Sequence, residues 1–203
     1  VPNPENEEAM ASICEAVRES NADLGVIFDT DVDRGGAVDS KGNEINRNRL
    51  VAVASAIALE GNDGGTIVTD SITSSGLKEF IENNLGGKHY RFRRGYKNVI
   101  DKALELNAEG INCPLAIETS GHAALRENYF LDDGAYLVTK IVIELARGKD
   151  IEKILEPLKM PAEELEVRFN ILDSDFKAYG QRVIAELEDY AKTRPDYEIA
   201  EDN

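Results

Sequence analysis

Three carboxylates stand two residues apart directly after a short apolar run. The run is Leu24 to Phe28, and it is followed by Asp29, Asp31 and Asp33. On a strand that bends into a loop, these side chains can turn to one side, and a set of oxygen ligands suits Mg²⁺. Three like charges so close together would otherwise repel, whereas capping the turn would need only one Asp. The spacing therefore predicts a magnesium site, with a solvated acidic turn as the alternative.

Two other chemistries begin with similar residues. A calcium-binding helix-loop-helix requires Gly at the sixth loop position and Glu at the twelfth, where this chain has Arg34 and Ser40. Phosphatases of the haloacid-dehalogenase type use an Asp nucleophile and an Asp general acid after a strand, and Asp29 and Asp31 fit these positions. The remaining phosphatase roles would fall to Asp70 or Ser71, Lys97, and Asp132 with Asp133. Asp33 stands where those enzymes normally carry Thr or Val, so the phosphatase is the second hypothesis.

A second polar loop follows the apolar run Leu115 to Ile117. It contains Glu118, Ser120 and His122. Open α/β sheets bind ligands where their strands end, and a carboxylate there can accept hydrogen bonds from two neighbouring hydroxyls of a sugar. A histidine in such a loop is, on its own, more often structural than catalytic. The loop therefore supports a sugar site only in combination with the acidic loop.

The surrounding sequence predicts the elements that would hold both loops. Apolar residues at helical spacing predict helices at 7–20, 48–60, 75–85, 97–107, 135–147 and 174–192. Short apolar runs predict strands at 24–28, 66–69, 89–93, 115–118, 167–171 and 197–200. Turn formers at 39–43 predict a hairpin that joins 37–38 to 44–45. This alternation indicates an α/β fold with mixed, mostly parallel sheets flanked by helices, in which strand 24–28 is covered on both faces.

Composition excludes several kinds of partner. The formal net charge of −16 would repel nucleic acid and anionic lipid, and no apolar run is long enough to cross a membrane. Cys14 and Cys113 are far apart in apolar sequence, so we expect free buried thiols and a cytoplasmic protein. The opening residues Val1 to Pro4 contain no initiator Met, so we expect an excised piece of a longer chain.

Four motifs together resemble the α-D-phosphohexomutases, the phosphomannomutase and phosphoglucomutase family. The run from Asp29 to Arg34 is similar to the Asp-Gly-Asp-x-Asp-Arg metal loop of that family, and Ile117 to His122 resembles its Gly-Glu-x-Ser-Gly-His sugar loop. Asp132 to Tyr136 is similar to its Asp-Gly-x-Tyr helix start, and Arg94 to Tyr96 lies where the family carries a Gly-His pair. The order and spacing also agree, from the first helix to about Arg147.

The resemblance implies an enzyme that moves a phosphoryl group between the 1- and 6-positions of mannose or glucose phosphate through a phosphoserine. Mg²⁺ would be the cofactor. The implied roles are metal ligand for Asp29, Asp31 and Asp33, catalysis for Arg34 and His122, and sugar binding for Glu118 and Ser120. We expect no nucleic-acid or membrane partner.

The chain also departs from the family pattern. Thr30 and Ile117 replace Gly, which lowers backbone freedom, and Tyr96 replaces His. The sequence contains neither a Thr-Ala-Ser-His-Asn-Pro nucleophile loop nor an Arg-x-Ser-x-Thr phosphate loop. We therefore expect a central fragment that is inactive alone. Its expected parts are the end of the second domain (1–45), a third, sugar-recognition domain (46–148), a linker (149–164) and the start of a fourth domain (165–203). A non-catalytic sugar-binding module is the third hypothesis.

Overall fold

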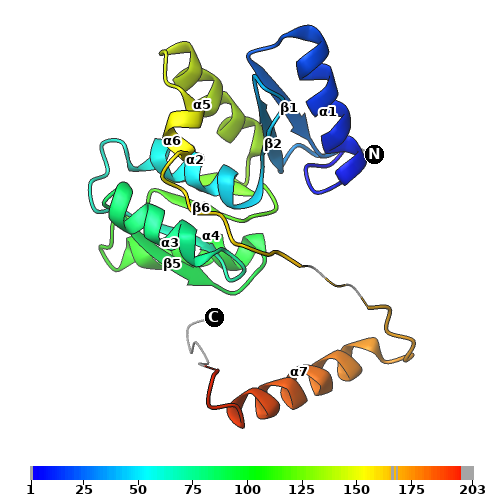
Figure 1. Cartoon of the computed structure of the whole chain (residues 1–203). Helices are drawn as coiled ribbons and strands as arrows, with labels where there is room; N and C mark the ends of the chain where they lie inside the picture. Colours follow the sequence, from blue (N-terminus) through cyan, green and yellow to red (C-terminus); the bar gives the residue numbers. More distant parts are fainter. Residues whose placement is uncertain (1, 166, 168, 198–203) are drawn as a thin grey trace. The chain divides into compact units, whose positions relative to one another are not determined.

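The computed structural model describes residues 2–165, 167 and 169–197. The chain divides into two compact units, Val1–Pro161 and Ala162–Asn203. The first unit holds two β-sheets and the helices that cover them (Figure 1). Both polar loops singled out in the sequence belong to this unit.

The smaller sheet is antiparallel. It consists of β1 (Leu24–Phe28), β2 (Gly35–Asp39) and β3 (Glu44–Ile45), in that order. Helix α1 (Glu7–Ser20) covers one face, where its buried side chains pack against Ile27 and Val38. Helix α5 (Gly134–Ala146) packs on the other face (Figure 1). Strand β1 is covered on both faces as predicted, but its pairing is antiparallel because the acidic loop turns the chain straight back along it.

The larger sheet is mostly parallel and has the order β5-β4-β6-β7. Its strands are β4 (Thr66–Asp70), β5 (Lys88–Phe92), β6 (Leu115–Ile117) and β7 (Ala123–Leu125). The first three run parallel, and β7 returns antiparallel to β6. The sequence predicted β4, β5 and β6 to within a residue or two but missed the three-residue strand β7. The 3-10 turn η2 (Arg126–Asn128) follows β7.

Helices cover both faces of the larger sheet, which gives three layers. Helix α4 (Tyr96–Ala108) packs on one face, and α2 (Arg47–Leu59) on the other. Helix α3 (Ser75–Glu79) lies with α2 and continues as the π-helical segment η1 (Phe80–Asn84). The sequence predicted this last stretch as one helix, because its apolar spacing does not reveal the widened turn.

One hydrophobic core joins the two sheets. Ala37 of the small sheet, Ile117 of the large sheet, Leu50 of α2 and Ile141 of α5 belong to the same cluster, and each is at most 1% exposed. Because the sheets share a packed core, the loops at their strand ends keep a defined position relative to each other.

The segment 149–164, which we expected to be a linker, contains a short helix. Helix α6 (Ile151–Leu155) lies within it, and both of its end residues are buried in the main core. The Asp150 side chain caps this helix. This helix was not predicted because it has only two core positions, four residues apart, and the surrounding residues are prolines and charged residues. The first unit accordingly extends to Pro161.

The second unit consists mainly of helix α7 (Phe176–Lys192), close to its predicted bounds. Phe176, Val183 and Ile184 on this helix are exposed. The described residues of the predicted strand 167–171 are not in a strand, and residue 168 lies outside the described part. Residues 198–200 of the predicted strand 197–200 also lie outside it.

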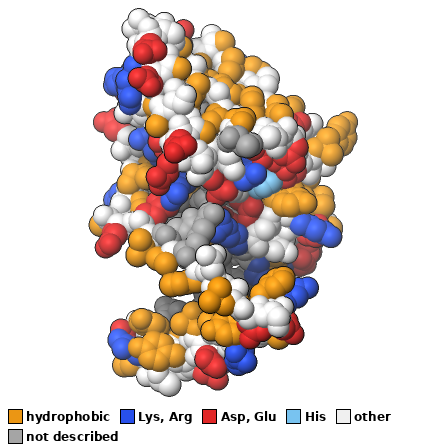
Figure 2. Space-filling model, turned by 90° about the vertical axis from the view of Figure 1, so that its right-hand side faces the viewer, with side chains coloured by type: hydrophobic (Ala, Val, Ile, Leu, Met, Phe, Trp, Pro, Cys, Tyr) orange, Lys and Arg blue, Asp and Glu red, His pale blue; other side chains and the backbone are white. Residues whose placement is uncertain are grey.

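Cys14 and Cys113 are buried free thiols, as predicted. Within the described chain, no helix combines the length and the apolar character that crossing a membrane requires. Figure 2 shows one face of the molecule, on which basic side chains are interspersed among the acidic ones. The overall negative charge therefore leaves room for local cationic sites.

Candidate functional site

The two polar loops meet where strands of both sheets end. The acidic loop follows β1, and the loop from Glu118 to His122 follows β6. Their backbones touch, because the Gly35 N–H donates to the Gly121 carbonyl at 3.2 Å and Arg34 forms an isolated β-bridge with His122. The sequence-predicted metal and sugar residues therefore line one region of the molecule.

Two glycines allow this close approach. A Cβ on Gly121 would lie 2.5 Å from the Gly35 carbonyl oxygen, and Gly121 has a φ of 101°. A Cβ on Gly134 would lie 2.6 Å from the backbone of Arg34 and Gly35. Real Cβ atoms do not approach that closely, so any side chain at these two positions would push the loops apart. These glycines are part of the site because they set the distance between its two halves.

The three carboxylates of the acidic loop converge. Asp29, Asp31 and Asp33 each offer an oxygen, and the three oxygens lie within 4.8 Å of one another. Asp29 is buried and accepts from Arg34 Nε at 2.6 Å, which compensates part of the negative charge. Asp33 Oδ1 is a buried oxygen with no hydrogen-bond partner among the described residues. An oxygen-only donor set with an unsatisfied buried oxygen fits a hard divalent cation such as Mg²⁺.

The pKa values of two of these carboxylates move in opposite directions. Burial raises the pKa of Asp29, but hydrogen bonds and attraction from Arg34 outweigh it, so the net shift is downward. For Asp33, burial and the neighbouring Asp29 charge outweigh the attraction of His122, and the pKa is raised. Asp29 is thus held ionised by Arg34, whereas Asp33 lacks a counter-charge of comparable strength.

The strained backbone conformation of the acidic loop is at Val32, and not at Thr30. Val32 has a φ of 66°, a left-handed conformation that is rare for a β-branched side chain. Neither Thr30 nor Ile117, which replace the family's glycines, has a positive φ, and Ile117 sits in regular strand β6. Those two departures therefore impose no left-handed strain, and the cost falls on the residue between the second and third carboxylates.

The loop from Glu118 to His122 is mostly buried and is hydrogen-bonded to a third loop. Glu118 Oε1 accepts from the Gly95 N–H at 2.6 Å, which joins it to the segment that follows β5. Glu118 Oε2 has only a long contact of 3.5 Å with the Ser120 hydroxyl, so this oxygen retains capacity for another donor. Burial raises the pKa of Glu118 despite the Gly95 hydrogen bond. Glu118 and Ser120 therefore lie next to each other in this loop.

The His122 ring is surrounded by two carboxylates and an aromatic ring. Its Nδ1 is 2.7 Å from Asp132 Oδ2 and 3.7 Å from Asp33 Oδ2, and the Tyr96 ring stacks on it at a centroid distance of 5.0 Å. Burial lowers the pKa of His122, but Asp132 and the other carboxylates outweigh it, so the net shift is upward. Tyr96 therefore packs against the loop that contains His122.

Sequence reasoning missed Glu5 and considered Asp70 only for the alternative phosphatase. Glu5 forms ion pairs with Arg34 at 3.2 Å and with Arg94 at 3.7 Å, so it joins the acidic loop to the loop after β5. Nothing in the sequence around Glu5 distinguishes it. Asp70 accepts two hydrogen bonds from Thr119, through its backbone N–H and its hydroxyl. The only signal for Asp70 was its place at the end of a predicted strand.

Comparison with known protein families decides the classification. The family description "Phosphoglucomutase/phosphomannomutase, alpha/beta/alpha domain III" matches residues 46–160, more than half of the chain. The description of domain II of the same family matches residues 1–42. The chain belongs to the phosphoglucomutase/phosphomannomutase family. Its two α/β parts are of the type found in that family, with a mostly parallel mixed sheet and a small antiparallel sheet.

Individual relatives agree with this classification. The chain is 32% identical, over 70% of its length, to a phosphomannomutase/phosphoglucomutase of Pseudomonas syringae pv. tomato, and 31% identical, over 84%, to a phosphoglucosamine mutase of Lactobacillus gasseri. It covers 29% and 33% of these two proteins. The chain therefore spans about a third of the relatives that it matches.

Solved structures of the family have the same fold. A phosphoglucomutase/phosphomannomutase family protein of Burkholderia thailandensis superposes with a TM-score of 0.67 at 28% identity, over 78% of this chain and 33% of that one. An N-acetylphosphoglucosamine mutase of Aspergillus fumigatus, solved in complex with GlcNAc-6P and magnesium, has a TM-score of 0.50 at 13% identity, over 72% and 39%. At that identity, the second likeness concerns the fold alone.

Proposed function

We propose that this chain is the metal- and sugar-binding part of a phosphohexomutase that moves a phosphoryl group between the 1- and 6-positions of a hexose. The observation that carries the proposal is the backbone contact between the acidic loop and the sugar loop, through Gly35 and Gly121. This contact supports the proposal because it brings the three Asp of one loop close to Glu118 and Ser120 of the other, and phosphoryl transfer on a sugar would need a cation beside the reacting hydroxyl. Family membership supports the same conclusion.

The cation would be held by Asp29, Asp31 and Asp33. When bound, Mg²⁺ supplies Lewis-acid stabilisation of the charge on a phosphoryl group. Arg34 keeps Asp29 ionised through the 2.6 Å hydrogen bond, so that this ligand is available at neutral pH. The phosphoserine that donates the phosphoryl group would come from sequence outside this chain.

The sugar would be held by the second loop. Glu118 Oε2 and the Ser120 hydroxyl would accept from and donate to neighbouring hydroxyls of the hexose. His122 Nδ1 lies 2.7 Å from Asp132 Oδ2, so Nε2 is the ring nitrogen that would exchange a proton with the substrate. A proton would then be held or released at Nε2 beside the reacting hydroxyl.

The phosphatase hypothesis has less support. It requires Asp29 to attack a phosphorus atom, but Asp29 is 6% exposed and Arg34 Nε lies 2.6 Å from its Oδ2. Of the two residues offered for the role after the next strand, Asp70 or Ser71, Asp70 is already engaged, because both of its oxygens accept hydrogen bonds from Thr119. These two contacts favour the mutase assignment.

Isothermal titration of the chain with Mg²⁺ tests the metal part of the proposal. Asp31→Ala removes one of three anionic ligands from an exposed position, so we expect the affinity to fall at least about tenfold, or about 1.4 kcal/mol, without loss of the fold. Asp63→Ala is the matched control, because it removes the same charge from an exposed loop after α2. Equal Mg²⁺ affinities of the two variants would contradict the proposed site.

Turnover assays separate the three functions. A mutase part without its nucleophile should convert no mannose 1-phosphate to the 6-phosphate by itself, and detectable conversion would refute the fragment assignment. Hydrolysis of p-nitrophenyl phosphate that needs Mg²⁺ and disappears in Asp29→Asn would establish the phosphatase instead. Unchanged Mg²⁺ and sugar-phosphate affinities in Asp31→Ala and Glu118→Gln would favour a module that keeps only the fold.

A further inference from the structure

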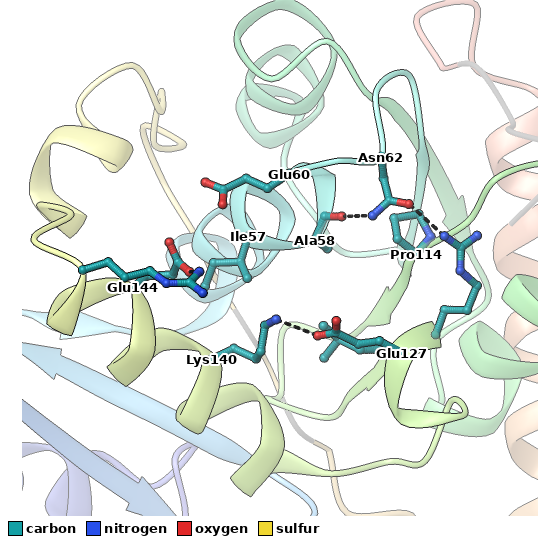
Figure 3. Close-up of a pocket in the computed structure, with 11 residues that line it drawn as sticks. Ile57, Ala58, Glu60, Asn62, Pro114, Glu127, Lys140 and Glu144 are labelled. Atoms are coloured by element: carbon teal, nitrogen blue, oxygen red, sulfur yellow. Dashed lines mark hydrogen bonds and ion pairs between the residues drawn. The ribbon is translucent and has the colours of Figure 1, made fainter.

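A pocket lies at the start of β6, whereas the candidate site lies at its end, and Figure 3 shows the residues that line this pocket. Its walls come from the end of α2, the residue before β6, turn η2 and the second half of α5, and its volume is about 340 Å³. Pro114, which lines it, directly precedes β6, whereas Glu118 directly follows that strand, so β6 separates the two sites. A cavity of this size can hold a small organic molecule.

The carboxylates that line the pocket already have cationic partners. Their ion pairs are Glu127 with Lys140 at 2.7 Å, Glu144 with Arg147 at 2.7 Å and with Lys149 at 2.6 Å, and Glu60 with Lys149. Figure 3 shows Lys140 and Glu127 directed toward each other along one side of the pocket. The negative charges of the lining are therefore compensated within the protein.

Arg126 is different, because its positive charge faces neutral partners. Its guanidinium donates to the side-chain oxygens of Asn107 at 3.2 Å, Asn112 at 2.6 Å and Asn62 at 2.8 Å. Among the described residues, no carboxylate forms an ion pair with it. Three amides fix the guanidinium in place without neutralising it, and two of its five N–H groups stay available. In a chain of net charge −16, Arg126 is thus an exposed cation at the lining of the pocket that three amides orient and that no carboxylate of the described residues pairs with.

We propose that this pocket binds a small organic anion, whose phosphate or carboxylate group pairs with Arg126. A planar guanidinium that is already oriented matches either group with two N–H donors and loses little freedom on binding. Lys140 lines the same pocket and can turn from Glu127 to the ligand. The apolar side chains of Ile57, Ala58 and Leu125 provide a surface for the body of the molecule.

Two-dimensional NMR titrations of the chain with inorganic phosphate, and separately with citrate, test this site and distinguish the two anionic groups. We expect saturable shifts of the backbone amides around Arg126 and Asn62. Arg126→Gln should weaken the affinity at least about tenfold. Arg126→Lys should restore only part of it, because an ammonium lacks the planar fork. Lys153→Gln is the matched control, since this lysine is 81% exposed and lies outside the pocket.

The outcomes decide the proposal in either direction. If Arg126→Gln disturbs the spectrum beyond the pocket, Lys140→Gln replaces it and should also weaken binding relative to Lys153→Gln. Equal affinities of the pocket and control variants overturn the proposal, as does the absence of saturable pocket shifts with both anions. Shifts confined to the loops of Asp29 and Glu118 also overturn it, because the anion would then occupy the candidate functional site.

Discussion

The protonation of His89 tests how burial in the folded protein changes the pKa of a side chain. Its ring lies at the start of β5, where Nε2 is 2.7 Å from the Thr69 hydroxyl and Nδ1 is buried without a partner among the described residues. Burial, with repulsion from Arg91 and Lys78, lowers the pKa of His89 from 6.5 to about 3. The folded protein therefore keeps His89 neutral at a pH where the unfolded chain protonates it.

The expected effect on stability follows from this difference. Between the folded and unfolded pKa values, from about 3 to 6.5, the unfolded state binds more protons, so stability falls as the pH falls. At pH 5 the unfolded state gains RT ln(1 + 10^1.5), or about 2 kcal/mol, from protonation of this residue. His89→Gln removes the titrating group and retains a polar partner for Thr69. The wild-type chain should then lose about 2 kcal/mol more than the variant between about pH 7 and pH 5.

Urea unfolding in EDTA at both pH values measures this difference, and the imidazole NMR signals report the pKa directly because the chain has only two histidines. His122→Gln is the control with the opposite sign. The folded pKa of His122 is raised, so its stabilisation is fully present below about 6.5 and is lost as the pH rises through the folded value. The reasoning about His89 fails if wild type and His89→Gln lose the same stability on acidification.

Three further predictions concern the two loops. Gly121→Ala should destabilise the chain by about 2 kcal/mol or more in urea unfolding, because its Cβ would lie 2.5 Å from the Gly35 carbonyl; a neutral result would show that the loops can separate freely. Val32→Gly should stabilise it by up to about 1 kcal/mol by removing left-handed strain, and a loss of stability would contradict that account. Asp132→Asn should lower the NMR-measured pKa of His122, and an unchanged pKa would exclude Asp132 as the cause of the upward shift.

Local spacing was enough to predict most of the elements. The strands predicted at 24–28 and 66–69 are β1 (Leu24–Phe28) and β4 (Thr66–Asp70), and the helix predicted at 7–20 is α1 with those bounds. These features depend on residues that are close in sequence, so their signals survive without the fold. Short elements were missed, because three residues in β7 or five in α6 carry too few core positions to produce a period.

The sequence by itself determined the chemistry that each loop offers: the three acidic oxygens of one and the carboxylate, hydroxyl and imidazole of the other. Only the tertiary structure decided that Glu5 bridges two arginines, that Gly121 and Gly134 bring the loops into contact, and that the two histidines shift their pKa values in opposite directions. The physical reason is that close approach and charge state depend on neighbours that are distant along the chain. The positions of those neighbours are set only when the two sheets pack against α5 in the shared core.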